Sequence, residues 1–298
     1  MSNQIHYTLC PVCGSAGISK VFNVKDNTVS QEYFEIYHCA NCQARFTQDP
    51  PSESGIGEYY KSEDYISHTD TSKGFINRIY RFVRNYSLNQ KKALVEKATG
   101  SKSGSLLDVG SGTGHFAATM KKAGWDVTGL EPDADARAVA MQRHSLKLFP
   151  TEELFNLPAN KFNAITLWHV LEHVHELKKY ITAFKKLLKD NGKLFIAVPN
   201  YTSYDASVYQ EHWAAYDVPR HLYHFTPHTM QLLMKEFGLK ILAVKPMWFD
   251  SYYVSLLSSK YKNGDTKWFS AVWTGLVSNF KAMNDAKKCS SVIYVISK

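Results

Sequence analysis

The sequence lacks the segments that mark membrane-spanning and secreted proteins. No apolar run approaches the roughly 20 residues that a membrane helix needs. The first 30 residues contain neither a basic start nor an apolar signal core. No internal repeat occurs, and the net charge of +8 comes from lysines that are spread along the chain, so charge points only weakly to anionic partners. With 298 residues, 44% of them hydrophobic, we expect a cytoplasmic protein with one large domain and one small module.

Cysteine is scarce, but its spacing is informative. Four of the five cysteines form Cys10-Pro-Val-Cys13 and Cys39-Ala-Asn-Cys42. Two such knuckles supply the four thiolates of a structural zinc site. Two disulfides are the alternative, which a reducing cytoplasm disfavours. We expect Cys289 to be a small buried residue beside the final strand.

The first part of the chain has the pattern of a zinc ribbon over residues 1–48. Apolar residues around Val21–Val24 and alternation over Tyr33–Tyr37 predict short strands between the knuckles. Metal takes the place of a hydrophobic core in such modules. Residues 49–73 are rich in proline, serine, glycine and acidic residues, which is typical of a linker.

A basic amphipathic helix is expected from residue 74 to about 97. Its apolar residues recur at helical spacing, with arginines and lysines between them. A membrane-surface or nucleic-acid-binding helix is one interpretation. We favour a helix that packs on the following domain.

From Ser105 onward, short apolar runs alternate with helical stretches. This rhythm predicts an α/β domain over residues 74–298, with a doubly wound parallel sheet and helices on both faces. A helical segment at about 248–286 precedes the last strand, Ser291–Ser297. It holds aromatic residues that either cover an acceptor pocket or take part in ordinary helix packing: Trp248, Phe249, Tyr252, Tyr253, Trp268, Phe269 and Trp273.

A glycine-rich turn joins the first strand of this domain to its first helix. Gly110, Gly112 and Gly114 are spaced G-x-G-x-G, unlike the G-x-G-x-x-G of nicotinamide-binding folds. Glycines allow close approach of the backbone to a ligand, and the helix start offers free N–H groups. Glu131 ends the second strand, nineteen residues past Gly112. A carboxylate there can accept hydrogen bonds from both ribose hydroxyls of a nucleoside.

These residues, together with the segment from Trp168 to Val174, resemble class I S-adenosylmethionine-dependent methyltransferases. The resemblance implies a Rossmann-like seven-stranded sheet with an antiparallel last strand. It implies that the glycine loop faces the methionine part of S-adenosylmethionine and that Glu131 holds its ribose. It also implies that Trp168 and His169 lie beside the methyl group. The expected cofactor-binding residues are Asp108, Gly110, Ser111, Gly112, Gly114, Glu131, Pro132 and Trp168.

The segment His169-Val-Leu-Glu172-His173 is similar to the Glu-x-x-Glu-His of ubiquinone O-methyltransferases, with His169 in place of the first acid. A second metal ion is therefore one interpretation, weakened by the lost carboxylate. We favour the other, in which Glu172 and His173 brace the next helix.

The stretch DVPRHLYHFT at residues 217–226 partly resembles the H-E-H-x-x-Y-F-S loop of sugar C-methyltransferases, which also carry a zinc module. Arg220 replaces their glutamate, so carbon deprotonation by that carboxylate does not carry over. We predict that His221 is a general base, with His169 as its rival, and that Arg220 anchors an anionic group. Tyr223 and His224 would orient the substrate. The alternative is that the side chains of this stretch only brace a loop.

The sequence as a whole predicts S-adenosylmethionine-dependent methyl transfer to a small or glycan- or lipid-linked, anionic acceptor. RNA methylation, with the ribbon binding nucleic acid, is the alternative; the ribbon lacks interleaved basic and aromatic residues, which disfavours it. A non-catalytic cofactor-binding protein is a third interpretation, for which the intact glycine loop gives no support.

Overall fold

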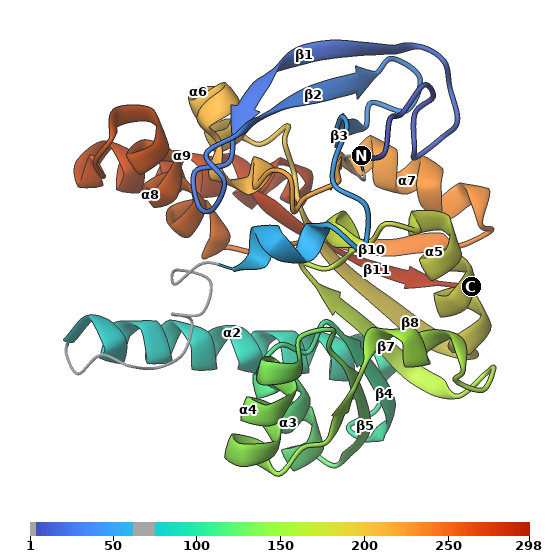
Figure 1. Ribbon diagram of the computed structural model, residues 1–298. Helices are drawn as coiled ribbons and strands as arrows, with labels where there is room; N and C mark the ends of the chain where they lie inside the picture. Colours follow the sequence, from blue (N-terminus) through green and yellow to red (C-terminus); the bar gives the residue numbers. More distant parts are fainter. Residues whose placement is uncertain (1–3, 62–74) are drawn as a thin grey trace.

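A seven-stranded sheet forms the centre of the larger domain (Figure 1). The computed structural model describes residues 4–61 and 75–298, with side chains from residue 83 onward in the second range. The sheet order is β10-β11-β8-β7-β4-β5-β6. The strands are β4 (Gly104–Val109), β5 (Trp125–Leu130), β6 (Leu148–Phe149), β7 (Phe162–Trp168), β8 (Leu188–Pro199), β10 (Lys240–Pro246) and β11 (Ser291–Ser297).

Only β11 breaks the parallel direction of this sheet. The β4–β5, β4–β7, β5–β6 and β7–β8 pairs are parallel. The last strand, β11, runs antiparallel to both β8 and β10. These pairings confirm the expected Rossmann-like architecture with an antiparallel last strand.

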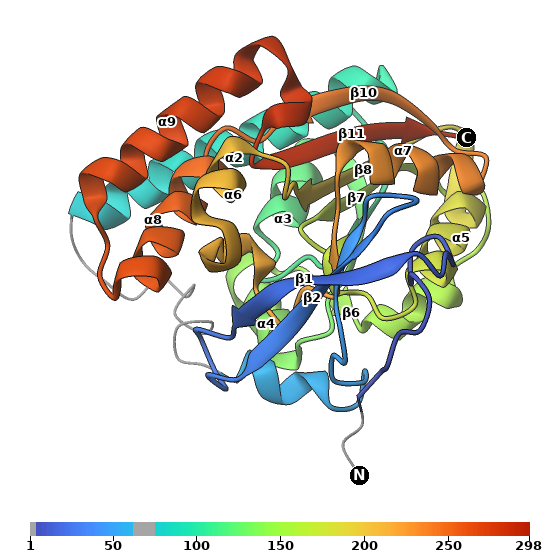
Figure 2. The same cartoon turned by 90° about the horizontal axis from the view of Figure 1, so that it is seen from above.

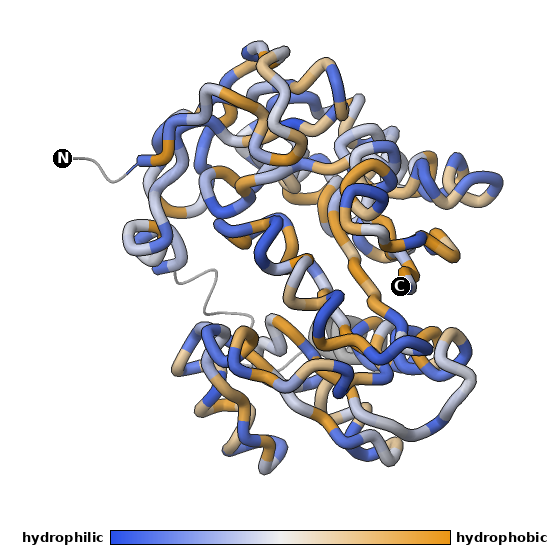
Figure 3. The backbone as a smooth tube through the Cα atoms, turned by 90° about the vertical axis from the view of Figure 1, so that its right-hand side faces the viewer, coloured by the Kyte–Doolittle hydropathy of each residue, from blue (hydrophilic) through white to orange (hydrophobic). Residues whose placement is uncertain are grey.

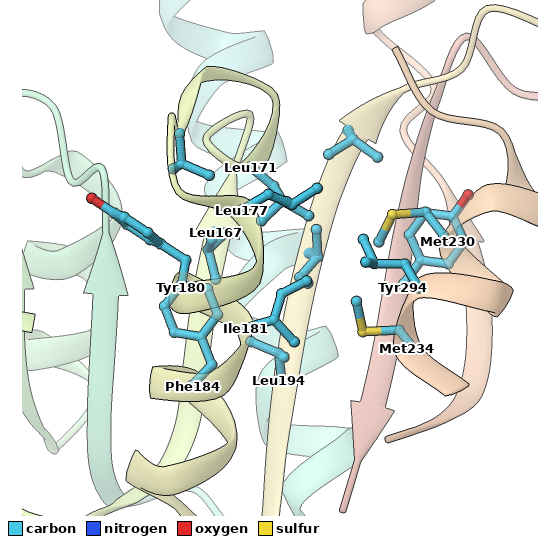
Figure 4. Packing of buried hydrophobic residues seen from close by; sticks show 14 of the residues in the cluster. Leu167, Leu171, Leu177, Tyr180, Ile181, Phe184, Leu194, Met230, Met234 and Tyr294 are labelled. Atoms are coloured by element: carbon cyan, nitrogen blue, oxygen red, sulfur yellow. The ribbon is translucent and has the colours of Figure 1, made fainter. Parts of the chain in front are cut away.

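Helices cover both faces of the sheet because successive strand residues point to opposite sides. Leu106 of β4 packs with Phe116 of α3 (His115–Lys122) and Val95 of α2 (Phe75–Thr99). Its neighbour Leu107 belongs to the cluster on the other face, under α5 (Leu177–Leu187) and α7 (Pro227–Glu236). Figure 4 shows Ile181 of α5 beside Leu194, and helix α7 beside β11. Figure 3 shows hydrophobic runs of the backbone in both the upper and the lower part of the view.

The helix expected at 74–97 is observed as α2, Phe75–Thr99. Val95 is fully buried, and Leu88 and Leu94 are partly buried against the same cluster. In this part of the helix the packed interpretation is therefore confirmed. Residue 74, the side chains of residues 75–82 and the linker residues 62–73 lie outside the described part of the structure.

The amino-terminal module is a small antiparallel sheet that is completed from far along the chain. Its order is β1-β2-β3-β9, formed by β1 (Ile18–Lys25), β2 (Tyr33–Cys39), β3 (Arg45–Thr47) and β9 (Tyr223–His224). The register pairs Arg45 with His224 and Phe46 with Tyr223. A strand from the stretch DVPRHLYHFT thus joins the module to the larger domain, and the two share one sheet across the expected linker.

Two helices lie between β10 and β11, where a helical insertion was expected. They are α8 (Asp250–Asn263) and α9 (Trp268–Asn284). Figure 2 shows α9 at the periphery, with α8 and α6 (Tyr204–Tyr209) on its inner side. Trp268, Phe269 and Trp273 are mostly exposed, so core packing does not account for them. No helix among the described residues is long and apolar enough to cross a membrane.

Side-chain caps determine where the helices α4 and α7 begin. The helix α4 (Ala134–His144) begins at Asp133, whose side chain accepts hydrogen bonds from the backbone N–H groups of Asp135 and Ala136. Helix α7 begins in the same way at Thr226, followed by Pro227 at its first turn. Thr226 is also the last residue of the stretch DVPRHLYHFT, so this stretch leads directly into α7, which packs on the sheet.

Candidate active site and candidate metal centre

The glycine turn after β4 has the backbone that its sequence predicts. Gly110, Gly112 and Gly114 have φ values of 68°, 53° and 81°, which only glycine adopts without strain. A Cβ on Gly110 would lie 2.4 Å from Cγ2 of Val170, whereas one on Gly112 would meet no atom within 4 Å. The turn is therefore packed on one side and open above Gly112, as a surface that receives a ligand would be.

Glu131 closes this turn from the end of β5. Its Oε2 accepts a hydrogen bond of 2.7 Å from the backbone N–H of Gly112, and Oε1 accepts one of 3.1 Å from that of Asp133. Burial raises the pKa of the carboxyl group. Each oxygen retains a further lone pair for a ligand hydroxyl. Pro132 follows, and its carbonyl accepts a hydrogen bond from Nη1 of Arg137.

Asp108 and Ser111 stabilise the turn from below. The carboxylate of Asp108 is 1% exposed and accepts a 2.7 Å hydrogen bond from Oγ1 of Thr166. Burial raises its pKa to about 6. Ser111 donates its hydroxyl to the carbonyl of Asp108, 2.9 Å away. Asp108 thus lies beneath the expected cofactor surface and braces it.

Trp168 and His169 lie at the carboxyl end of β7, beside β4. The Trp168 ring packs edge-on against Phe116 and under Nζ of Lys91, 4.6 Å from the ring centre. His169 has φ +59°. Its Nε2 lies 2.8 Å from Oδ2 of Asp250, and its Nδ1 lies 3.3 Å from Oε1 of Glu172.

His169 is held in its charged form by these two carboxylates. Burial alone lowers the pKa of a histidine, but Asp250 and then Glu172 outweigh it and raise the pKa of His169 to about 10. A protonated imidazole has no lone pair with which to accept a proton. This state is unsuited to the role of rival general base.

Glu172, His173 and His221 converge next to His169. Each offers one metal-ligating atom, and these atoms lie within 4.8 Å of one another. Oε2 of Glu172 is buried and has no hydrogen-bond partner among the described residues. Nδ1 of His221 lies 2.9 Å from the carbonyl of Ala215, which requires a donated N–H and leaves the lone pair on Nε2.

His173 is neutral in this cluster. Burial, followed by the nearby His221, lowers its pKa to about 4. The rings of His173 and His221 meet edge to face, 4.5 Å apart. The carboxylate and the two imidazoles could hold a divalent ion or orient a proton-bearing acceptor. Glu172 itself is fully buried, and its backbone carbonyl accepts a hydrogen bond from Leu222, so it also braces the neighbouring stretch.

The partners of Arg220 favour a structural role over the expected anchoring of an anionic acceptor. Its Nη2 lies 3.0 Å from Oδ1 of Asp26 in the ribbon and 2.7 Å from Oδ1 of Asp217. Its Nη1 donates to the carbonyl of Tyr59 over 2.8 Å. The guanidinium is buried, 2% exposed, and already paired, so it fastens the ribbon to the larger domain.

Tyr223 and His224 are likewise placed at the junction. The hydroxyl of Tyr223 donates to the carbonyl of His175 over 3.0 Å, and burial raises its pKa. Nε2 of His224 lies 3.4 Å from Oγ1 of Thr47 in the ribbon. Both are buried in β9, a position that favours bracing over the predicted orientation of a substrate.

The four cysteines of the knuckles form one group, with ligand atoms within 4.8 Å of one another. Sγ of Cys10 lies 3.6 Å from that of Cys42, and Sγ of Cys13 lies 3.6 Å from that of Cys39. Tetrahedral zinc with bonds of about 2.3 Å separates its sulfur ligands by about 3.8 Å. The donor set and spacing fit zinc, and the cysteines are free.

The comparisons with known proteins agree with this geometry. A family profile described as "Methyltransferase domain" matches residues 80–244, more than half of the chain. The chain belongs to the class I S-adenosylmethionine-dependent methyltransferases. The glycine turn, Glu131, Trp168 and His221 all fall within the matched region.

Curated relatives of this methyltransferase include ubiquinone biosynthesis O-methyltransferases. The mitochondrial one from Rattus norvegicus is 26% identical over 163 residues, which cover 49% of this chain and 47% of the relative. The one from Xanthomonas axonopodis pv. citri is 28% identical over 161 residues, covering 49% and 67%. The chain therefore spans about half of the rat relative's length.

Solved structures show the same fold at low identity. Magnesium protoporphyrin IX methyltransferase from Synechocystis, with bound SAH, has a TM-score of 0.54 at 15% identity, covering 82% of this chain and 98% of that one. Phosphoethanolamine N-methyltransferase 2 from Haemonchus contortus, in complex with S-adenosyl-L-methionine, has a TM-score of 0.52 at 15% identity, covering 93% and 71%.

Sequence reasoning missed the partners that determine the state of this methyltransferase site. Asp250, which raises the pKa of His169, lies 81 residues away in the chain. Asp26, which pairs with Arg220, lies 194 residues away. No local motif signals either contact, because the fold alone brings such distant carboxylates together.

Proposed function

We propose that this chain transfers a methyl group from S-adenosylmethionine to a small-molecule acceptor, free or linked to a glycan or lipid. One observation carries the proposal: Glu131 and the open face of Gly112 meet at the carboxyl ends of β4 and β5, inside the matched methyltransferase region. The named relatives and fold neighbours, which include ubiquinone-biosynthesis and porphyrin enzymes, support a small acceptor.

The residues present fit the cofactor. Gly112 leaves space above the turn, and Glu131 offers free lone pairs for ribose hydroxyls. Trp168 has a buried Nε1 without a partner among the described residues, which a bound ligand could satisfy. When bound, S-adenosylmethionine would supply a methyl group attached to a positively charged sulfur. The sulfur leaves as a neutral thioether, so the transfer needs only alignment of the acceptor and no acid to protonate the leaving group.

His221 is the proposed general base. Its Nε2 holds the lone pair because Nδ1 is committed to the carbonyl of Ala215. Glu172 stands close by as a carboxylate. Burial raises its pKa, but the hydrogen bond and the charge of His169, together with the neighbouring histidines, outweigh burial and lower it. A carboxylate beside His221 stabilises the imidazolium that forms when the ring takes a hydroxyl proton. The positive charge of His169, 3.3 Å from Glu172, offsets the negative charge of the Glu172 carboxylate.

The small-molecule proposal is preferred to RNA methylation because the second knuckle of the ribbon is used for docking. The carbonyl of Cys42 accepts a 2.9 Å hydrogen bond from Oγ1 of Thr229, and that of Gln43 accepts one of 2.5 Å from the hydroxyl of Tyr201. The ribbon is thereby turned toward its own domain. We propose that one structural zinc, held by Cys10, Cys13, Cys39 and Cys42, maintains it.

Cofactor binding is the first test. Calorimetry should show that Glu131→Ala weakens the binding of S-adenosylmethionine by roughly 1.5 to 3 kcal/mol, the value of hydrogen bonds to a charged group. Asp126→Ala, an exposed carboxylate at the opposite end of β5, is the matched control and should bind normally. Undiminished affinity in Glu131→Ala would remove the assignment of the cofactor site.

Turnover is the second test. With radiolabelled S-adenosylmethionine and pools of quinone-like, glycan and RNA acceptors, transfer should occur to a small molecule. His221→Ala should then lower kcat about 100-fold or more without weakening cofactor binding. His228→Ala, an exposed histidine on α7, should retain activity. Near-normal turnover in the His221 variant would exclude it as the base.

A further inference from the structure

The helix α9 buries its polar and small residues and exposes its apolar ones, the reverse of a helix in a water-soluble domain. Its buried residues are Ala271, Thr274, Gly275, Ser278, Asn279 and Ala282. Its exposed large apolar residues are Trp268, Phe269, Val272, Trp273, Leu276, Phe280 and Met283. The second set, which we call the α9 stripe, recurs at intervals of one, three and four residues and therefore forms one continuous face.

The orientation of α9 is determined by specific contacts on its inner side. A Cβ on Gly275 would lie 2.9 Å from the Tyr252 ring of α8, so the two helices approach closely at this position. Ser278 donates a 2.6 Å hydrogen bond to the buried Asp205. Asn279 donates one of 2.8 Å to the carbonyl of Trp248. These contacts hold the stripe toward solvent.

The exposure of the stripe is large. Phe269 is 88% exposed, Met283 69%, Phe280 68% and Trp273 60%. Contiguous apolar patches of this kind mark sites of interaction with a protein or a membrane. The helix lies beyond residue 244, where the match to the methyltransferase profile ends.

Lysines stand at both ends of the stripe. Lys267, which pairs with Asp265 over 3.1 Å, precedes its amino-terminal end, and Lys281, Lys287 and Lys288 lie at its carboxyl-terminal end beside Asp285. Residues 260–288 hold six lysines and two aspartates, so a second copy packed by twofold symmetry would bring two net positive surfaces together, which is unfavourable. Tryptophan and phenylalanine flanked by lysine match the apolar and anionic layers of a lipid surface.

We propose that α9 binds flat on the surface of an anionic lipid bilayer, with the α9 stripe in the interface between headgroups and acyl chains. Its aromatic rings enter the apolar layer while the lysines meet anionic headgroups. The contact is peripheral, and it would hold the protein at the surface where lipid-linked or lipid-soluble molecules reside.

Vesicle flotation with the full chain tests this without any activity measurement. Vesicles of phosphatidylcholine and phosphatidylglycerol in equal parts should carry the protein, and vesicles of phosphatidylcholine alone should carry clearly less. The double variant Trp273→Ser/Phe280→Ser should lower binding to the mixed vesicles at least about tenfold, because it removes two aromatic groups that would enter the apolar layer of the bilayer. Lys287→Glu/Lys288→Glu should lower it several-fold and remove its salt dependence.

The matched control is Leu242→Ser/Met141→Ser, which alters exposed apolar residues outside α9 and should bind vesicles as the native protein does. Equal binding of native protein and stripe variant would overturn the proposal. So would native protein that floats with neither vesicle. Sedimentation showing a dimer that the stripe variant abolishes would assign the stripe to a second copy instead. Native far-ultraviolet circular dichroism excludes unfolding as the cause of lost binding.

Discussion

At the scale of single residues, neighbouring carboxylates and a carbonyl give the two candidate histidines different protonation and hydrogen-bonding states. His169 lies between Asp250 and Glu172, which raise its pKa to about 10. His221 keeps a lone pair on Nε2 because its other nitrogen faces a carbonyl. Both histidines stand out in the sequence as candidate bases. Only their neighbours distinguish them.

The raised pKa of His169 predicts a pH dependence of stability. The unfolded side chain has a pKa of about 6.5, below that of the folded state, so the charged form is favoured by folding. This contribution is complete below about pH 6.5 and is lost as the pH rises through about 10. The gap in unfolding free energy between native protein and His169→Gln should shrink by roughly 2 to 4 kcal/mol from about pH 6 to 10.

Denaturant unfolding across that range, followed by circular dichroism, measures the gap. His228→Gln serves as the control, and its curve should run parallel to that of the native protein. A constant gap between native protein and His169→Gln would show that the histidine is not charged in the folded state. Its status as rival base would then be restored.

At the scale of elements, the stretch DVPRHLYHFT connects the amino-terminal ribbon to the larger domain. It supplies β9 to the ribbon sheet, places Arg220 between Asp26 and Asp217, and leads into α7 through the Thr226 cap. The same short stretch thereby joins ribbon, sheet and His221. Sequence reasoning predicted an acceptor site here, with Arg220 as an anion anchor, whereas the structure pairs that arginine with two carboxylates.

Because Arg220 connects the ribbon to the larger domain, its replacement should lower the free energy of unfolding. Arg220→Met should lower the free energy of unfolding by about 3 to 5 kcal/mol, because two carboxylates lose their buried counter-charge. Lys20→Met breaks an exposed pair with Glu35 and should cost less than about 1 kcal/mol. Urea titrations compare the two. An Arg220 variant of native stability with a raised acceptor KM would reinstate it as an anion anchor.

At the scale of the whole molecule, the zinc module and the methyltransferase domain form one structure. The ribbon sheet includes β9, and the carbonyl of Cys42 accepts a hydrogen bond from α7. Metal loss should therefore disturb the domain that carries His221 as well as the ribbon itself.

Elemental analysis of protein purified without chelator should find one zinc per chain. Cys39→Ser should lose it and lower the thermal midpoint, because a structural metal contributes folding free energy directly. Cys289→Ser, outside the group, should keep the zinc. A second equivalent of metal that disappears in Glu172→Gln would place an ion at the Glu172, His173 and His221 cluster. Metal-free native protein would contradict the zinc site.

Features that depend on residues close in the chain were predictable from the sequence. The strand rhythm, the glycine turn with Glu131 and the two cysteine knuckles each follow from local spacing, because periodicity and turn chemistry act over short distances. Tertiary structure alone decided the pairing of β9 with β3, the burial of Arg220, the charge on His169 and the outward face of α9. Each depends on contacts between segments far apart in sequence, where burial and distance determine the energies of charges and apolar surfaces.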